Sequence, residues 1–227
     1  MDQAIKYPYG LDGKDIVGVG ITAVVARLDA VVKFAAATER LYMERERRAK
    51  PVALSLRLGW VEHIAEAVAF IHSKNVLHGD ISCNNVFVDH SLKVKLGDFA
   101  GSGIDEEPPL ICYETSHEHP SIGDTSIKSE IFALGSTFYE IMTGSKPYKE
   151  LSDPKICDAY ELGKCPGLNS LTALNDIIAK CWAQEYANID ALLVDIKEEV
   201  AIKAAQVTWI KPCALIQTPA FQIAMTS

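Results

Sequence analysis

The stretch that decides the fold is HGDISCNNVFVDHSLKVKLGDFAG, residues 78–101. Within it, the two short runs 86–88 and 94–96 are rich in valine and flank a polar turn, a pattern that predicts a β-hairpin. Asn85 stands directly before this hairpin and Asp98 shortly after it. Because the two strands of a hairpin run antiparallel, we expect the chain to return Asp98 to the side of Asn85. Taken singly, each of these polar residues could instead be a turn-capping residue.

On both sides of this stretch, most of the predicted elements are helices, which the spacing of apolar residues indicates. Upstream, the pattern from Leu58 onward predicts a helix that ends near Ser73. Residues 15–34 alternate β-branched runs with glycines, which predicts short strands and tight turns, and residues 38–49 predict a charged surface helix. Downstream, the spacing predicts a long helix closed by Gly144 and two further amphipathic segments. The apolar positions are Ile127, Ile131, Leu134, Phe138 and Ile141, then Leu171, Leu174, Ile178 and Trp182, then Ile189, Leu192, Ile196 and Val200.

The composition is that of a globular protein. Of 227 residues, 48% are hydrophobic and 23% are charged, which is enough apolar material for a sizeable core. The formal net charge of −8 argues against a nucleic-acid partner. The first ten residues lack the apolar core of a secretory signal, and no apolar run approaches the ~20 residues of a membrane helix. We therefore expect an intracellular protein of the cytoplasm or nucleus, without a membrane partner. The six cysteines have no C-x-x-C spacing and are expected to be reduced and mostly buried.

Several motifs, taken in chain order, resemble those of one family. Residues 78–85 (HGDISCNN) resemble the catalytic loop H-R-D-L-x-x-x-N, and residues 98–101 (DFAG) resemble D-F-G. Residues 18–25 (GVGITAVV) resemble a G-x-G-x-x-G-x-V loop, although a plain turn has the same glycine pattern, and residues 30–33 (AVVK) resemble V-A-I-K. The chain is thus similar to eukaryotic-type protein kinases, in particular to the small kinase-like proteins of filamentous fungi, over about residues 16–186.

The later half of the chain extends this resemblance. Residues 128–135 (KSEIFALG) resemble the S-D-x-x-x-x-G central helix of the family, and residues 180–182 (KCW) resemble its C-W helix. The fold implied is α+β, a protein kinase-like two-lobe fold with a reduced N-terminal β lobe and a mainly α-helical C-terminal lobe. Its expected parts are an N-terminal extension (1–14), a reduced nucleotide-binding lobe (15–50), a helical catalytic lobe (51–206) and a C-terminal tail (207–227).

The resemblance implies ATP-dependent phosphoryl transfer to a hydroxyl of a protein substrate, with serine or threonine favoured over tyrosine. The cofactors implied are ATP and Mg²⁺. Asp80 would be the base that accepts the proton of the attacking hydroxyl, and Asn85 and Asp98 would hold Mg²⁺. The ATP-binding residues implied are Gly18, Gly20, Val25, Lys33 and Glu46. Glu46 is the expected ion-pair partner of Lys33, with Glu44 as the alternative, but both carboxylates could instead be solvated helix charges.

Three replacements separate the chain from the family pattern. Gly79 takes the place of the arginine that would pair with a phosphorylated activation loop, so we expect no regulation by loop phosphorylation. Ser82 stands where serine/threonine kinases place a lysine, and a hydroxyl cannot neutralise phosphate charge, so turnover should be slow. Glu130 replaces the aspartate of the central helix and must fit a buried network that anchors the catalytic loop.

The largest departure is the interval from Lys33 to His78, which has only 45 residues. In the family this interval also holds two strands, the hinge that binds adenine and another helix, which need on the order of 30 to 40 more residues. Nucleotide binding should therefore be weak and poorly selective for adenine. A pseudokinase or scaffold module is the second interpretation, and a truncated product that folds poorly is the third. Because H-G-D-x-x-x-x-N also resembles the loop of aminoglycoside and choline phosphotransferases, a small-molecule phosphotransferase is a further alternative.

Overall fold

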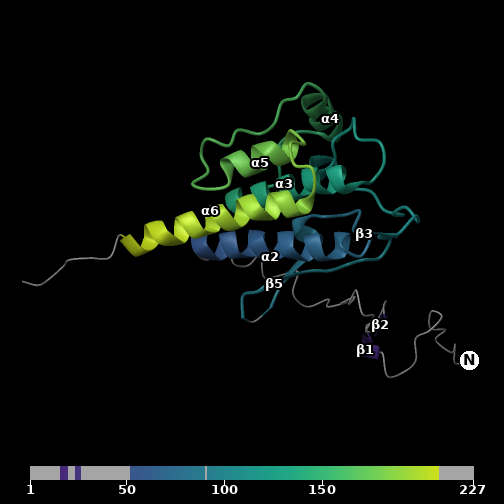
Figure 1. Cartoon of the computed structure of the whole chain (residues 1–227). Coiled ribbons are helices and arrows are strands. Elements are labelled where there is room, and N and C mark those ends of the chain that lie inside the picture. The colour runs from purple at the N-terminus through teal and green to yellow at the C-terminus, as the bar shows by residue number, and fades with distance from the viewer. Residues whose placement is uncertain (1–15, 20–23, 27–51, 90, 210–227) are drawn as a thin grey trace, which may run out of the picture.

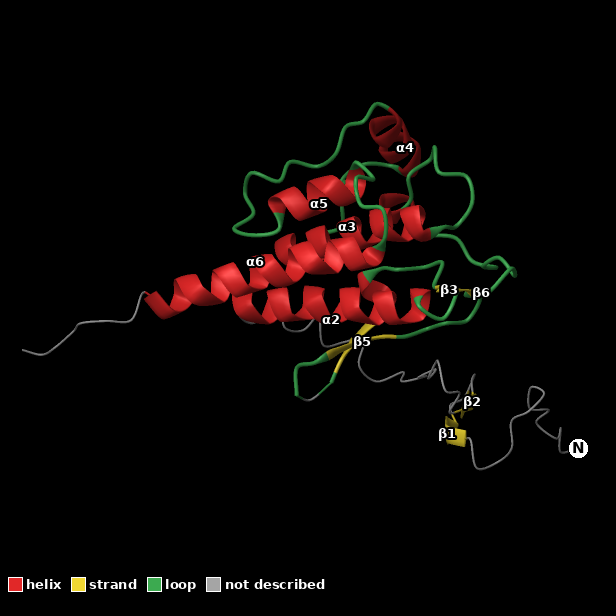
Figure 2. Cartoon of the chain, in the orientation of Figure 1, coloured by secondary structure: helices red, strands yellow, loops and turns green. Residues whose placement is uncertain are grey.

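The computed structural model describes residues 16–19, 24–26, 52–89 and 91–209 (Figure 1). Helices form the body of this part of the chain, as Figure 2 shows. They are α2 (Leu54–His72), α3 (Ile127–Thr143), α4 (Asp153–Glu161), α5 (Asn175–Trp182) and α6 (Ile189–Trp209), with the 3-10 turns η1 (Cys83–Asn85) and η2 (Thr115–His117).

The described strands are short and form three antiparallel pairs, β1–β2, β3–β6 and β4–β5. Their bounds are β1 (Ile16–Val19), β2 (Val24–Ala26), β3 (Val76–Leu77), β4 (Val86–Val88), β5 (Val94–Leu96) and β6 (Gly103–Ile104). The hairpin β4–β5 has the bounds that the sequence predicts, and β1–β2 agrees with the short strands predicted within residues 15–34.

Helix α2 carries the chain into the candidate site. It begins before Leu58, the first position of the predicted pattern, and it ends at His72 with Ser73 as its C-cap, close to the predicted end. Its buried face packs against α6, α3 and the hairpin β4–β5. The indole N–H of Trp60 donates a hydrogen bond of 2.8 Å to the carbonyl of Leu92, next to the hairpin turn. The hairpin β4–β5 is therefore held against α2, and the catalytic loop lies between these two elements along the chain.

Helix α3 is the centre of the core. Its predicted apolar positions are buried at Ile131, Leu134, Phe138 and Ile141. At its start, Ser126 and Ser129 form a reciprocal capping box in which each hydroxyl accepts a hydrogen bond from the other residue's N–H. At its end, Gly144 has φ 77°, a left-handed C-cap that glycine adopts without steric cost. The sequence signals and the observed helix agree at both ends.

Contact between α3 and α5 depends on a glycine. A Cβ atom at Gly135 would lie 2.7 Å from the Cβ of Cys181, so only glycine permits this approach of the two helices. Beside it, the indole N–H of Trp182 donates to the hydroxyl of Ser136 at 3.1 Å, and both residues are buried. Both residues of the C-W pair are thereby fixed against the central helix.

Three features of the fold differ from the sequence predictions. Helix α4 was not predicted, because it buries only Ile156 and Tyr160 and so has little periodicity. The pair β3–β6 was not predicted, because each strand has two residues. Helix α6 continues to Trp209, past the boundary expected after residue 206. The predicted helix over 38–49 lies outside the described residues.

The cysteines and the helices bear on two further expectations. The five described cysteines are free thiols, but Cys181 alone is buried, and Cys112 and Cys165 are exposed. The expectation of mostly buried thiols is therefore wrong for the described part of the chain.

In that same part, no helix combines the length and the apolar character needed to cross a membrane.

Candidate active site

His78 fixes the start of the catalytic loop (residues 78–85). Its ring is buried, with 1% of the side-chain surface exposed. Nδ1 accepts a hydrogen bond of 3.2 Å from the backbone N–H of Asp80, and Nε2 donates to the carbonyl of Gly97 at 3.0 Å. The ring also packs on Phe99, with the ring centroids 4.8 Å apart. One side chain thus joins the catalytic loop to the D-F-A-G stretch.

Asp80 and Asn85 are in direct contact. The side-chain amide of Asn85, 2% exposed and held in η1, donates to the Asp80 carbonyl at 2.7 Å and to Asp80 Oδ2 at 2.8 Å. Burial raises the pKa of Asp80, and the nearby carboxylates of Glu114 and Asp98 raise it further, while the Asn85 hydrogen bond and His78 oppose the shift. A half-buried carboxyl with a raised pKa and a fixed orientation is suited to accept a proton.

Asp98 lies beside this pair, as the hairpin geometry predicted. The ladder of β4–β5 pairs Val86 with Leu96, and the N–H of Gly97 then donates to the carbonyl of Asn85 at 2.9 Å. Asp98 follows directly, in a left-handed backbone conformation with φ 60°. An amide and a carboxylate are thereby brought together, and oxygen donors of this kind are the ligands that Mg²⁺ prefers. Within the described residues, this site included, no three His, Cys, Asp or Glu side chains are grouped to hold a metal ion by themselves.

Glu130 joins three elements in the core. Its side chain projects from α3 and is completely buried. Oε1 accepts a hydrogen bond of 2.8 Å from the backbone N–H of Gly79, and Oε2 lies 2.5 Å from Nε2 of His72 at the end of α2. The prediction that Glu130 fits a buried network anchoring the catalytic loop is confirmed. The partner His72 was not predicted.

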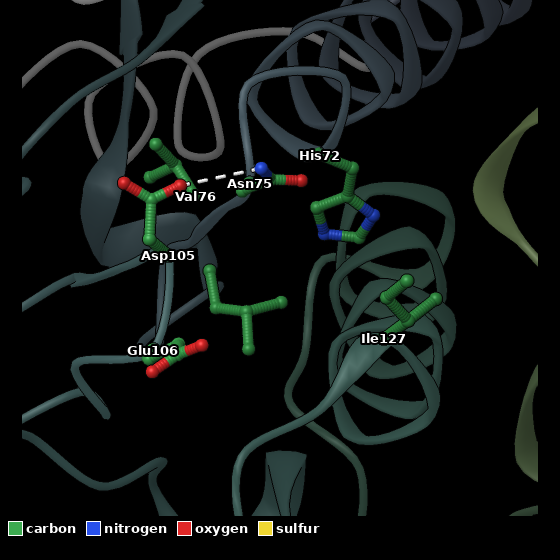
Figure 3. Close-up of a pocket in the computed structure, with 7 residues that line it drawn as sticks. His72, Asn75, Val76, Asp105, Glu106 and Ile127 are labelled. Carbon is green, nitrogen blue, oxygen red and sulfur yellow. Dashed lines mark hydrogen bonds between the residues drawn. The ribbon is translucent and has the colours of Figure 1, made fainter.

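An open pocket of about 440 Å³ lies next to this anchor (Figure 3). Its lining residues are His72, Asn75, Val76, Leu77, Asp105, Glu106 and Ile127. On one wall of the pocket, the side-chain amide of Asn75 donates to Asp105 at 3.2 Å, as the dashed line in Figure 3 marks. Through His72 the pocket adjoins the network that holds the catalytic loop.

The structure adds Glu114 as a further contact of the catalytic loop, which the sequence did not indicate. One of its carboxylate oxygens accepts a hydrogen bond from the side chain of Asn84, and the other pairs with Lys146. These residues are far apart in the sequence, so no local pattern could reveal the contact. Ser82, at the position of the missing lysine, is 1% exposed, and its hydroxyl has no hydrogen-bond partner among the described residues.

The predicted nucleotide-binding residues are described only in part. Gly18 in β1 is the direct register partner of Val25 in β2, so the structure brings these two predicted positions together. Gly20, Lys33 and Glu46 lie outside the described residues. The predicted contact of Lys33 with a glutamate therefore stays a prediction, as do the roles of all the site residues.

Comparison with known proteins agrees with this arrangement. Residues 19–189 match the family described as protein tyrosine and serine/threonine kinase. The megakaryocyte-associated tyrosine-protein kinase of Mus musculus is 27% identical over 149 residues, which cover 60% of this chain and 28% of the mouse protein. The chain therefore belongs to the protein kinase family, with an α+β fold of few strands and several helices that corresponds to a reduced two-lobe kinase. The matched part spans well under two thirds of the mouse relative.

Proposed function

We propose that the chain is a protein kinase that transfers a phosphoryl group from ATP to a hydroxyl of a protein substrate. The observation that carries this proposal is the cluster of Asp80, Asn85 and Asp98 at the two ends of the hairpin β4–β5. The cluster combines a proton acceptor with two oxygen donors, and a phosphoryl transfer needs both.

In this proposal Asp80 orients the substrate hydroxyl and accepts its proton. Its raised pKa places the carboxylate closer to the range in which a general base is effective. The hydrogen bond from Asn85 fixes the rotamer of Asp80, and the bond from Gly79 N–H to Glu130 holds the backbone just before it. A base fixed from both sides needs little reorganisation when the hydroxyl arrives.

The donor set fits Mg²⁺ together with the phosphates of a nucleotide. The amide oxygen of Asn85 and the carboxylate of Asp98 are the groups that would hold the ion, and phosphate oxygens and water complete such sites. When bound, the ion would neutralise charge that develops on the phosphates. Gly18, Gly20, Val25, Lys33 and Glu46 are the residues we propose on the ATP side.

A pseudokinase or scaffold module is the second candidate, and two features favour it. The interval between Lys33 and His78 is short for a full nucleotide lobe. Ser82 presents a neutral hydroxyl in place of a lysine beside the proposed base. Both features reduce turnover without affecting the fold of the helical lobe, so an inactive binding module is the alternative outcome of the tests below.

The substitution Asp80→Asn tests the proposed base. It preserves shape but removes the proton acceptor, so phosphorylation of a peptide library should fall by about 10²-fold or more while nucleotide binding persists. Asp158→Asn, at an exposed position on α4, is the matched control and should leave the activity unchanged. Equal activity in Asp80→Asn and the wild type would mean that another protein produces the signal, and the pseudokinase would then be the better interpretation.

Asp98→Asn tests the proposed metal site. Mg-ATP at a hundredfold excess over its Kd should stabilise the wild type by about 2.7 kcal/mol. For a chain of this size that is a rise of roughly 5 to 11 °C in Tm. The variant should lose most of this rise, and omitting Mg²⁺ should have the same effect on the wild type. An unchanged rise in the variant would remove Asp98 from the site.

We propose serine or threonine as the acceptor, although the mouse relative is named a tyrosine-protein kinase. Matched peptides that differ only in serine, threonine or tyrosine at the acceptor position decide this point. A preference for the tyrosine peptide would replace our proposal. The net charge of −8 supports a protein rather than a nucleic acid as the partner.

A further inference from the structure

Three glycines lie close to Pro109 and Ile111, near the end of the segment that begins with the D-F-A-G stretch. We call residues 98–111 the return segment, and Gly79, Gly101 and Gly103 the glycine socket. A Cβ atom at Gly79 would lie 2.8 Å from Cβ of Pro109 and 3.1 Å from Cγ2 of Ile111. A Cβ atom at Gly103 would lie 2.6 Å from Cδ of Pro109. Real Cβ atoms do not approach so closely, so Pro109 and Ile111 occupy space that only glycine leaves open.

The backbone of the return segment brings these two side chains to the socket. Ile104 and Glu107 exchange backbone hydrogen bonds of 3.1 and 3.0 Å, which reverse the chain direction. The N–H of Leu110 then donates to the carbonyl of Gly101 at 2.8 Å. Side chains alternate along extended chain, so Pro109 and Ile111 face the glycines while Leu110, 90% exposed, faces away.

The socket belongs to both the catalytic loop and the return segment. Gly79 directly precedes Asp80, and its φ of 81° excludes most other residues. The hydroxyl of Ser102, between the other two glycines, donates to the carbonyl of His78 at 3.0 Å. Packing at the socket therefore fixes the return segment on the loop that carries the proposed base.

The return segment contains no opposite charges that could pair with one another. Residues 98–111 contain four carboxylates and no lysine or arginine. Residue 79 provides no cation for a phosphate, because it has no side chain. A phosphate added here would face only like charges within the segment.

We propose that the glycine socket, together with the β3–β6 pairing and the Ser102–His78 hydrogen bond, seats the return segment on the catalytic loop, and that Pro109 and Ile111 are positioning residues for Asp98. The role at Asp98 rests on the proposed function. The packing itself does not.

Gly79→Ala tests the packing, with Gly144→Ala as the matched control. Both glycines have a left-handed φ, 81° and 77°, so both substitutions add similar backbone strain. Around Gly144, however, no atom lies within 4 Å of the added Cβ. Amide hydrogen exchange at Leu110 should become on the order of tenfold faster in Gly79→Ala and stay unchanged in Gly144→Ala. Equal exchange at Leu110 in both variants and the wild type would overturn the proposal.

Removal of the two side chains that fill the socket is the second test. The double variant Pro109→Ala, Ile111→Ala should also speed exchange at Leu110, while Leu110→Ala, at an exposed position, should leave the exchange of neighbouring amides unchanged. Exchange in the interior of α3 should not change in either variant, which verifies that the lobe stays folded. Wild-type exchange rates in the double variant would show that the filled socket does not hold the segment.

Two further measurements test the positioning role at Asp98 separately from the packing of the return segment. The Mg²⁺-dependent rise in Tm with ATP should shrink in the double variant, and kcat should fall more than KM for the peptide rises. A variant with faster exchange but a wild-type response to Mg-ATP would overturn the positioning role. If the wild type itself shows no response to Mg-ATP, the proposed function fails, and the exchange data still decide whether the socket holds the segment.

Discussion

Helix α3 and the return segment are held in place by different kinds of packing. In α3, large side chains such as Phe132 and Phe138 are fully buried, and the helix is capped at both ends. In the return segment, Pro109 and Ile111 pack into the space left open because Gly79 and Gly103 have no side chains. Leu110, between these two residues, is 90% exposed. The comparison teaches that α3 depends mainly on the many large side chains that it buries, whereas the return segment depends on two side chains that fill space left open by glycines.

The largest expected loss of stability comes from removing the buried ring of Phe132 in α3. Phe132 is 0% exposed and packs edge-on against His119 and Tyr160. Phe132→Ala should lower the free energy of unfolding by about 3 to 5 kcal/mol, because it removes buried surface and leaves a cavity. Urea unfolding followed by circular dichroism measures this loss. Leu110→Ala in the return segment should cost less than about 0.5 kcal/mol, and similar losses in both variants would contradict the comparison.

The same contrast explains what the sequence could predict. Periodic burial within one helix is a local pattern, so the spacing from Ile131 to Ile141 and the cap at Gly144 predict α3 with the correct end. Contacts of the return segment join Gly79 to Pro109, thirty residues away in the sequence. The sequence showed that Gly79 replaces a positively charged arginine of the family. It could not show that Pro109 and Ile111 pack against Gly79.

Prediction of the candidate site was limited in the same way. Asp80 and Asn85 lie within one loop, and a hairpin of predictable length returns Asp98 to them. His72 and Glu114 reach the loop from other elements, so their contacts depend on how helices and loops pack. The signal that could have identified His72 is its place at the end of a predicted helix just before the loop.

The second prediction tests the link between the two regions. Glu130→Ala removes the acceptor of the Gly79 N–H and the partner of His72, leaving buried polar groups unpaired. The free energy of unfolding should fall by about 1 to 3 kcal/mol for the unpaired groups, and phosphorylation activity should fall with it. Glu106→Ala, at an exposed position, is the control and should change neither quantity. Full activity in Glu130→Ala would mean that α3 does not anchor the loop.

A smaller effect is expected at the start of α3. Ser126→Ala removes the hydroxyl that accepts the N–H of Ser129, so one turn of the helix loses its cap. Thermal or urea unfolding should register a loss of about 1 kcal/mol. Ser121→Ala, on the exposed loop that precedes the helix, should be neutral. A neutral result at Ser126 would show that buried side chains alone define the start of α3.

The smallest effect concerns the charge of Asp80. Its pKa in the folded state is raised above the usual 3.8, mainly by burial, so the ionised carboxylate lowers stability at neutral pH. Asp80→Asn should therefore raise Tm slightly at pH 7. This gain should shrink as the pH falls through the raised pKa and vanish below 3.8, where the carboxyl is protonated in both states. Melting curves of the two proteins across this range measure it, and a gain that grows at low pH would have the wrong sign.

The glycine at position 79 also has a consequence for signalling. Kinases that depend on a phosphorylated loop can be switched on by another kinase and off by a phosphatase, so their output records a recent event. In the arrangement that we propose, packing seats the return segment, and the chain would need no such reversible input at this point. Its phosphorylation activity in the cell would then depend on how much of the protein is made and degraded. Mutations that change stability, and with it abundance, would change this activity in proportion.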